Sequence, residues 1–426
     1  MDRSARAAFL GFAVTVALAA SRAPLWAQQQ NGSIYTQCPG DLNGDGIPDP
    51  PTPGHPNAAY RTNVKCMHLA AGDGFVTMAD GKQLYTFGFS DVTGLLPSEV
   101  VNGNGSRLGG LAAATYPAPT IHLKEGQEFY LSLTNVGMIM RPDLFDPHSV
   151  HFHGFPQAAA VFDGVPESSA TINMGSTFTY YYNIPVGLAG TYMYHCHVEA
   201  TEHIQMGMVG NLYIDPAQNG TAIPYGGRTY TRFAYNDGDG STGFDVEYPI
   251  QLGSFDGNFH EQHISIQPLP FAAMDDKYST LNGRGYPDTV EPSVKYTDVG
   301  FGNQPSQPYH SKIVATAGQR VLLRLSSLST TRFYTIASTI PMLVVGQSAK
   351  LLRGPSPGGS VPGQNLYYRT NSLTLGGGES YDVILDTAGV AAGTYLLYTT
   401  NLNYLSNDRE DYGGMMTEIT VTAAGL

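Results

Sequence analysis

Six of the 12 histidines of this chain lie between residues 148 and 203, together with one cysteine and followed by a methionine. They form two segments, His148-Ser-Val-His151-Phe-His153 and His195-Cys196-His197 with His203 and Met208 after it. A thiolate with two imidazoles and a weak axial thioether is typical of a blue-copper electron-transfer centre. The remaining imidazoles form an all-nitrogen set that suits copper, with zinc as the chemical competitor. The pattern therefore predicts copper redox chemistry.

Strand geometry divides these ligands between two sites. Side chains alternate between the two faces of a strand, so His195 and His197 are expected to point one way and Cys196 the other. One short segment then serves two metal sites that are joined through the backbone of a single residue. The predicted ligands of the thiolate site are His148, Cys196, His203 and Met208. Those of the all-nitrogen site are His151, His153, His195 and His197.

The composition predicts the elements that position these ligands. The chain has 426 residues, of which 42% are hydrophobic and 13% are charged, enough for a sizeable core and for about two domains. The 50 glycines and 28 prolines indicate many turns and favour an all-β chain. Short alternating runs such as residues 128–133 and 394–398 are typical of β-sandwich strands. A net charge of −13 argues against nucleic acid and anionic membranes as partners.

The first 27 residues are predicted to be a signal peptide. Arg3 and Arg6 precede an apolar run at residues 9–20, which is too short to span a bilayer. An uncleaved anchor is the competing interpretation. No second long apolar run follows, so we expect no membrane partner and a secreted or periplasmic location.

The rest of the chain divides into four parts. Residues 28–65 are expected to be an extended segment, residues 66–215 a first, copper-binding domain, residues 215–227 a linker, and residues 228–424 a second domain without a copper motif. The motifs "EGQEFYLSL" and "GTYMYH" of the first domain are echoed by "AGQRVLLRL" and "GTYLLY" in the second, which predicts two copies of one sandwich.

The extended segment holds a candidate calcium loop. Oxygen ligands at its positions 1, 3, 5 and 9, with glycine at position 6, match such a loop, although Thr52 stands where a bidentate Glu is usual. A solvated acidic turn is the alternative. The candidate calcium ligands are Asp41, Asn43, Asp45 and Asp49.

Two further patterns remain open at the level of sequence. Because Cys196 belongs to the histidine cluster, Cys38 and Cys66 are left to form a disulfide in an oxidising compartment, with two free thiols as the alternative. His260-Glu-Gln-His263 is a candidate ligand pair, but a surface loop is the favoured interpretation.

The segments "HSVHFHG" and "YHCHVEATEHIQMGM" resemble the multicopper oxidase family, whose members are built from tandem cupredoxin domains. The resemblance covers most of residues 66–424. It implies two tandem cupredoxin-like Greek-key β-sandwich domains and a type 1 copper at the thiolate site. It also implies a type 2 position for His151 and type 3 positions for His153, His195 and His197. Asp163 corresponds to a carboxylate beside the oxygen-reducing centre, where it would relay protons or orient a ligand.

The chain also departs from that family. A full three-copper centre in the family uses eight histidines, four from each of two domains, and this chain offers four. The similar two-domain copper nitrite reductases use the equivalents of His153 and His195 plus one histidine from a neighbouring subunit. His151 stands where those enzymes carry an aspartate. A homotrimer is an expectation from resemblance only.

We therefore expect a secreted copper-dependent oxidoreductase of multicopper-oxidase type. Electrons from a small-molecule or metal-ion reductant would enter at the type 1 copper and pass through Cys196 to a histidine-ligated centre, with oxygen as the acceptor. Two alternatives remain: an enzyme like the copper nitrite reductases, and a non-enzymatic electron carrier or copper-binding protein.

Overall fold

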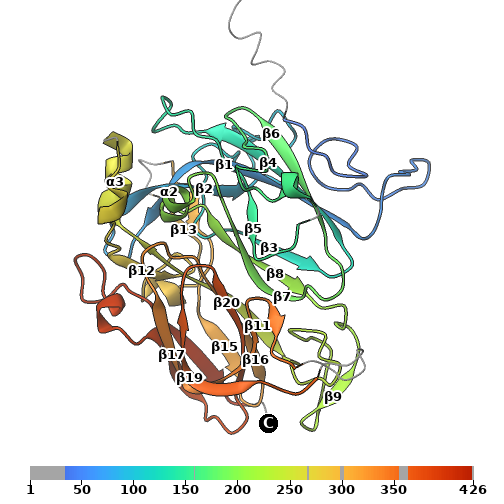
Figure 1. Cartoon of the computed structure of the whole chain (residues 1–426), viewed down its shortest axis with the longest axis vertical. Coiled ribbons are helices and arrows are strands. Elements are labelled where there is room, and N and C mark those ends of the chain that lie inside the picture. The colour runs from blue at the N-terminus through green and yellow to red at the C-terminus, as the bar shows by residue number, and fades with distance from the viewer. Residues whose placement is uncertain (1–33, 158, 266–267, 298–301, 355–362, 425–426) are drawn as a thin grey trace, which may run out of the picture.

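The computed structural model describes residues 34–157, 159–265, 268–297, 302–354 and 363–424. The predicted signal peptide, residues 1–27, lies outside these residues. The described chain is almost entirely strands and loops, arranged as an upper body drawn in blue to green and a lower body drawn largely in orange to red (Figure 1). The two bodies confirm the predicted fold class of two tandem cupredoxin-like Greek-key β-sandwich domains.

The first domain packs two four-stranded sheets against each other. One has the order β2 (Gln83–Asp91), β1 (Val64–Thr77), β4 (Glu128–Gly137), β6 (Thr177–Asn183). The other has the order β3 (Ala118–Lys124), β8 (Val209–Asp215), β7 (Gly190–His195), β5 (His151–His153). The alternation is visible in β6, where Tyr180 and Tyr182 are fully buried and Tyr181 between them is not. This core encloses the ligand segments.

The second domain is built on one ten-stranded sheet. Its strands are β11 (Val246–Phe255), β12 (Tyr278–Leu281), β15 (Ile313–Thr316), β16 (Arg320–Ser327), β17 (Tyr334–Gln347), β18 (Lys350–Leu351), β19 (Tyr368–Leu375), β20 (Glu379–Asp386), β21 (Gly393–Thr399) and β22 (Met416–Thr422). In β22, buried Ile419 and Val421 alternate with partly exposed Glu418 and Thr420, as a strand with one covered face requires.

The remaining elements are short. Two hairpins are formed by β9 (Ile223–Tyr225) with β10 (Arg228–Tyr230), and by β13 (Lys295–Tyr296) with β14 (Pro305–Gln307). The helices are α2 (Ala200–Met206) and α3 (Gly257–Ser265), with single turns at Ala160–Phe162, Phe271–Ala273, Asp288–Val290 and Leu402–Leu405. In the part of the chain that the structure describes, every helix is too short or too polar to cross a membrane.

The two domains share one pattern of strand pairing, which explains the sequence repeat. In the first domain β4 runs parallel to β1 and antiparallel to β6. In the second domain β16 runs parallel to β11 and antiparallel to β20. The echoed motifs "EGQEFYLSL" and "AGQRVLLRL" form β4 and β16, the corresponding strands of the two domains. The prediction of two copies of one sandwich is therefore confirmed.

Hydrogen-bonded charges join the two domains. Asp382 of β20 accepts a hydrogen bond of 2.6 Å from the Thr191 hydroxyl of β7. Arg324 of β16 is fully buried and lies 3.4 Å from the same carboxylate and 2.8 Å from Glu247. The guanidinium also lies 3.6 Å from Asp215 of β8, in the first domain. The Asp382–Thr191 hydrogen bond and the Arg324–Asp215 contact therefore join the two domains.

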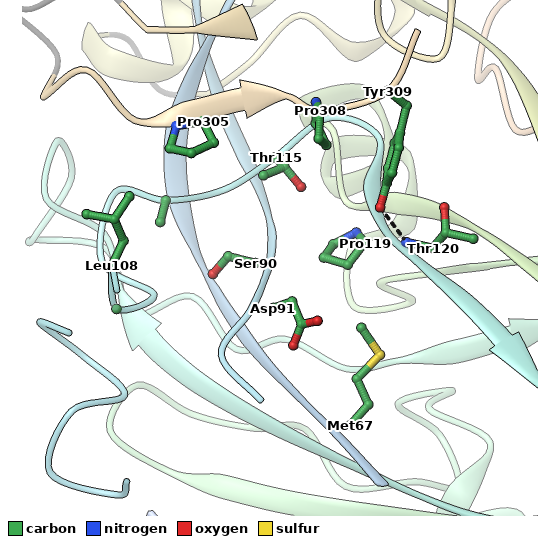
Figure 2. Close-up of a pocket in the computed structure, with 12 residues that line it drawn as sticks. Met67, Ser90, Asp91, Leu108, Thr115, Pro119, Thr120, Pro305, Pro308 and Tyr309 are labelled. Atoms are coloured by element: carbon green, nitrogen blue, oxygen red, sulfur yellow. Dashed lines mark hydrogen bonds between the residues drawn. The ribbon is translucent and has the colours of Figure 1, made fainter. Parts of the chain in front are cut away.

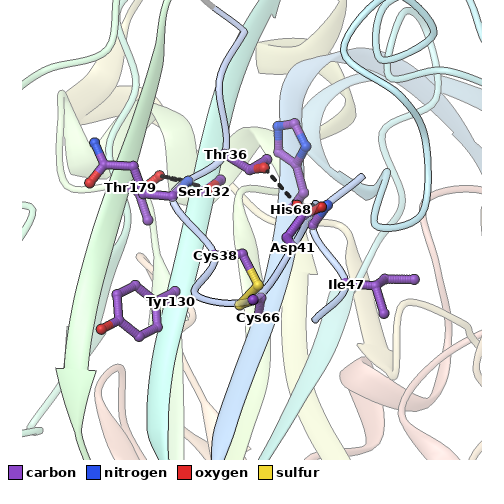
Figure 3. Close-up of a disulfide and its surroundings, with 12 residues drawn as sticks. Thr36, Cys38, Asp41, Ile47, Cys66, His68, Tyr130, Ser132 and Thr179 are labelled. Atoms are coloured by element: carbon purple, nitrogen blue, oxygen red, sulfur yellow. Dashed lines mark hydrogen bonds between the residues drawn. A yellow bond between two sulfur atoms is a disulfide. The ribbon is translucent and has the colours of Figure 1, made fainter. Parts of the chain in front are cut away.

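The N-terminal segment is attached to the first domain by a disulfide between Cys38 and Cys66, which confirms the predicted pair (Figure 3). The candidate calcium loop lies directly after Cys38. The carboxylate of Asp41 accepts backbone hydrogen bonds from Gly44 and Gly46 at 2.7 and 2.8 Å. These hydrogen bonds within the loop stabilise the turn. Calcium binding at the loop stays a prediction.

The disulfide predicts a measurable stabilisation. It closes a loop with a sequence separation of 28, so the double variant Cys38→Ser/Cys66→Ser should lose about 3–4 kcal/mol of unfolding free energy in the chain-entropy model. Denaturant unfolding of the full chain measures this loss. As a control, Arg61→Ala removes a solvent-screened ion pair with Glu128 near the same segment and should leave the unfolding midpoint close to that of the parent chain. Equal midpoints for the double variant and the parent chain would contradict the prediction.

Candidate copper sites

Pairing of two strands brings three of the predicted histidines together. Strand β5 runs antiparallel to β7, with His151 opposite His195. His153 lies two residues after His151 and therefore on the same face of the strand. One ring nitrogen from each of His151, His153 and His195 lies within 4.8 Å of the other two. We call these three residues the histidine triad.

Hydrogen bonds orient two rings of the triad. The Nδ1–H of His195 donates to the carbonyl oxygen of Cys196 at 2.8 Å, and the Nδ1–H of His151 donates to that of Asp163 at 2.7 Å. A carbonyl oxygen can only accept, so each ring keeps Nε2 as its free lone pair. Burial lowers the pKa of all three imidazoles, that of His195 to about 3. The triad is therefore neutral at physiological pH, which is the form that binds metal.

His197 lies beside the triad, and its ring is about as close to His151 and His195 as the triad rings are to one another. Its ring centre is 5.0 Å from that of His151 and 5.5 Å from that of His195. Strand β7 ends at His195, so the period of two no longer determines where His197 points. The backbone N–H of His197 donates to the Ser149 hydroxyl at 3.2 Å.

The second group of predicted ligands, which contains the thiol of Cys196, lies on the other side of the same backbone. His148, Cys196 and His203 each offer one ligand atom within 4.8 Å of the other two, and all three are almost completely buried. Cys196 Sγ is 3.1 Å from His203 Nδ1 and accepts a hydrogen bond of 3.3 Å from the Ser149 N–H. The Nδ1 atom of His148 is buried and has no hydrogen-bond partner. A buried nitrogen without a partner beside a thiol is what an absent metal ion would explain.

The electrostatics of this group favour the thiolate. Burial alone would raise the pKa of Cys196, but His203 and His148 outweigh burial and lower it to about 6. Burial alone would likewise lower the pKa of His203, whereas Cys196 and Asp146 raise it well above its ordinary value. The thiolate is the metal-binding form of cysteine, so the donor set fits a copper ion of the blue type.

Helix α2 brings Met208 back to the thiolate site. The helix ends at Gly207, whose φ of 116° is a backbone conformation that favours glycine. A Cβ at this position would also lie only 2.9 Å from the carbonyl oxygen of Phe87. Met208 is fully buried, and its carbonyl oxygen accepts a hydrogen bond of 3.1 Å from the Cys196 N–H. The fourth predicted ligand thus returns next to Cys196.

Asp163 lies against the triad. Its side-chain Oδ1 is 3.3 Å from Nδ1 of His151, and its backbone oxygen accepts the hydrogen bond from the same nitrogen. The carboxylate is partly exposed, so it touches both solvent and a triad ring.

Sequence reasoning missed a group of ionisable side chains beside His203. Asp146 Oδ1 lies 3.2 Å from His203 Nε2, and Glu202 Oε1 lies 2.6 Å from Nε2 of His263. The expectation that His260 and His263 occupy a surface loop is wrong, because both are fully buried on α3, which packs against β2 beside α2 (Figure 1). Nothing in the sequence around Asp146 marks this residue as a partner of a copper ligand. The i, i+3 spacing of His260 and His263, in contrast, could have indicated that both lie on one buried face of a helix.

The second domain holds α2 through Gln205. The side-chain amide of Gln205 donates to Asp276 at 2.9 Å and accepts from the Thr330 hydroxyl at 3.1 Å. Its backbone oxygen lies 2.9 Å from Nε2 of His260. Gln205 stands between His203 and Met208 in the sequence, so these contacts hold the segment that carries two ligands of the thiolate site. We call Gln205, Asp276, Thr330 and His260 the α2 clamp.

A separate cleft lies where residues 305–309 cross the first domain, and its volume is about 300 Å³ (Figure 2). Tyr309 borders it and accepts a hydrogen bond of 3.0 Å from the Thr120 N–H. Its lining includes Asp91 and Met67 but no residue of either ligand group.

Comparisons with known proteins agree with this geometry. Residues 102–219 match a domain family described as multicopper oxidase. An L-ascorbate oxidase of Cucurbita maxima is 24% identical over 289 residues, which are 64% of this chain and 41% of that protein. A laccase of Aspergillus fumigatus is 35% identical over 106 residues, 24% of this chain and 16% of that protein. The chain spans less than half the length of the curated relatives it matches.

Solved structures show the same fold. A blue copper oxidase from Nitrosomonas europaea superposes with a TM-score of 0.57 and 21% identity, over 84% of this chain and 86% of that one. A copper nitrite reductase from the same organism gives a TM-score of 0.53 and 16% identity, over 84% and 94% of the two chains. Residues 102–219 of this chain therefore match the multicopper oxidase family, and the tandem cupredoxin fold is shared with these solved copper proteins.

Proposed function

We propose that this chain is a copper-dependent oxidoreductase. It would take electrons from a reductant at a type 1 copper and deliver them to oxygen at a copper centre formed by the histidine triad. The type 1 copper would be held by His148, Cys196, His203 and Met208. The single observation that carries the proposal is the position of Cys196, whose thiol belongs to one ligand group while the adjacent His195 belongs to the other. Bound copper would supply reversible one-electron exchange at both sites.

The chain provides a short path between the two sites. From Cys196 Sγ the covalent route to the His195 ring crosses one peptide bond. The hydrogen bond from His195 Nδ1–H to the Cys196 carbonyl oxygen, 2.8 Å long, shortens that route. Both residues are buried, so water is kept away from the connection.

The carboxylates near His203 favour particular reductants. Exposed Glu199 and partly buried Glu202 each bring a carboxylate oxygen within 4.8 Å of a His203 ring nitrogen, and Asp146 adds a third carboxylate. With a net charge of −13 on the whole chain, a metal cation would be attracted and an anionic reductant repelled. The reductant would meet the protein at this face.

Asp163 is proposed to serve proton delivery at the histidine centre. Oxygen reduction consumes protons, and Asp163 is the partly exposed carboxylate that touches a triad ring. It would hold His151 in its metal-binding tautomer and pass protons from solvent to the centre.

Oxygen is proposed as the acceptor because the matched relatives are named ascorbate oxidase and laccase. A location outside the cytoplasm, secreted or periplasmic, is supported by the Cys38–Cys66 disulfide, since such bonds persist in oxidising compartments.

Oxygen uptake by the copper-loaded full chain tests the proposal. We expect an intense blue absorption band and oxygen consumption with ferrous ion or a neutral phenol as reductant. Cys196→Ser should abolish both, because the thiolate ligand and the path through it are lost. Nitrite is supplied in a parallel reaction as the competing acceptor. A fully copper-loaded chain that leaves oxygen unconsumed with every reductant would refute the proposal.

The α2 clamp predicts that the second domain tunes the type 1 site. Gln205→Met keeps the length and helix propensity of the side chain but removes both of its side-chain hydrogen bonds. We expect a shifted blue band and a changed reduction potential, together with a loss of about 1–3 kcal/mol of stability because buried Asp276 loses a partner. Absorption, paramagnetic resonance and potentiometry on the copper-loaded chain measure these changes.

The matched control for the clamp is Tyr309→Phe, which removes one hydrogen bond between segments 305–309 and 118–124 away from both ligand groups. This variant should keep the band and the potential of the parent chain. If Gln205→Met also keeps them, the clamp does not position the copper ligands.

A further inference from the structure

The histidines of this chain cannot complete a three-copper centre. Its second domain contains three histidines. His260 and His263 are fully buried beside α2 and β2, so they reach neither the triad nor a neighbouring subunit. The half-buried His310 accepts a hydrogen bond at Nδ1 from the Lys312 N–H. The eight-histidine set of the family therefore does not fit this chain.

The histidines of the first domain outside residues 148–203 do not fill the gap. His68 is fully buried with Nε2 2.7 Å from the Thr134 hydroxyl, and His122 pairs with Asp215 at 2.8 Å. His55 lies on the exposed N-terminal segment. None of these three belongs to a group of side chains that could hold a metal ion among the described residues.

We infer that the histidine triad holds a single copper ion, bound by His151, His153 and His195 of one chain, with Gly378 of that chain's second domain packed against the ring of His153. The inference rests on the proposed function, since it concerns the centre to which electrons would be delivered. It differs from the family pattern in the number of metal ions. It differs from the nitrite reductase pattern because no subunit is needed to complete the ligand set.

The spacing within the triad suits one ion. His153 Nδ1 lies 3.4 Å from His195 Nε2, and a ring nitrogen of His151 lies within 4.8 Å of both. Two imidazole nitrogens bound to one ion at about 2.0–2.1 Å with a tetrahedral angle are about 3.3 Å apart. The His153–His195 pair is therefore close to the separation that one ion requires, and His151 brings a third nitrogen within 4.8 Å of both.

Gly378 of the second domain packs against the Nε2 edge of the His153 ring. A Cβ on Gly378 would lie 2.7 Å from His153 Nε2, so only glycine leaves room for the ring. The turn is held by the Gly378 N–H, which donates to the Ser327 oxygen at 2.8 Å, and by the Gly376 N–H, which donates to Glu379 at 2.6 Å. The turn thus fixes the ring of His153 from its Nε2 edge, while Nδ1 on the other edge faces His195.

Copper counting on the full chain tests the inference. The chain is saturated with cupric ion, freed of excess metal, and analysed for copper per chain and by paramagnetic resonance. We expect two coppers, one of the blue type and one with nitrogen ligands. His153→Gln should bind one copper and keep the blue band, since His153 is not a ligand of the thiolate site.

A glycine pair provides a second test that leaves every ligand in place. Gly378→Ala and Gly389→Ala impose similar backbone strain, since the φ values are 91° and 78°. A Cβ on Gly389 meets no atom within 4 Å, whereas one on Gly378 meets His153. We expect Gly378→Ala to bind the second copper at least tenfold more weakly and to keep the blue band, and Gly389→Ala to bind both coppers like the parent chain.

The outcomes separate this inference from the proposed function. Three or more coppers per chain, or a second copper that survives His153→Gln, would overturn the single-ion site. Loss of the second copper when the protein is diluted to monomers would overturn its completion within one chain. Two coppers with the expected variant behaviour but no oxygen uptake would support the inference and refute the proposed function.

Discussion

Burial of the Cys196 sulfur among imidazoles is the constraint on which the rest of the structure depends. An ionised sulfur in a protein core is costly unless opposite charge and hydrogen-bond donors surround it. Here His203 lies 3.1 Å from Sγ and the Ser149 N–H donates to it. Both contacts come from segments outside strand β7, so the first domain must bring three separate segments together to keep this thiolate. The same requirement explains why α2 needs support from outside.

The second domain provides that support although it carries none of the predicted copper ligands. It contacts the ligand segments at two separate places, the α2 clamp around Gln205 and the turn at Gly378 over His153. The Asp382–Thr191 hydrogen bond and the Arg324–Asp215 contact join the two domains in the orientation that both places need. A duplicated sandwich that lacks copper ligands can therefore remain necessary for the copper sites of its partner. Its role is to position ligands.

Local patterns in the sequence predicted the fold and three members of each proposed ligand group, because both depend on short-range rules. Alternation along strands gave the sandwich fold, and it gave the separation of Cys196 from His195 onto two sites. The contacts of Asp146 with His203 and of Gly378 with His153 were not predicted. They join segments far apart in the chain, and neither aspartate nor glycine has a spacing that marks such a contact. The burial of His260 was missed because helix α3 is short and polar at most positions.

The number of metal ions connects the structure to the chemistry of oxygen. Reduction of one oxygen molecule to water takes four electrons and four protons, whereas two electrons and two protons give hydrogen peroxide. A chain with one type 1 copper and one copper at the histidine triad stores two electrons when both ions are reduced. Because the triad offers three nitrogen ligands for one ion, the number of electrons that one chain can hold follows from this ligand set. The product of oxygen reduction would then depend on whether two chains can deliver electrons to the same oxygen molecule, which a site closed within one chain opposes.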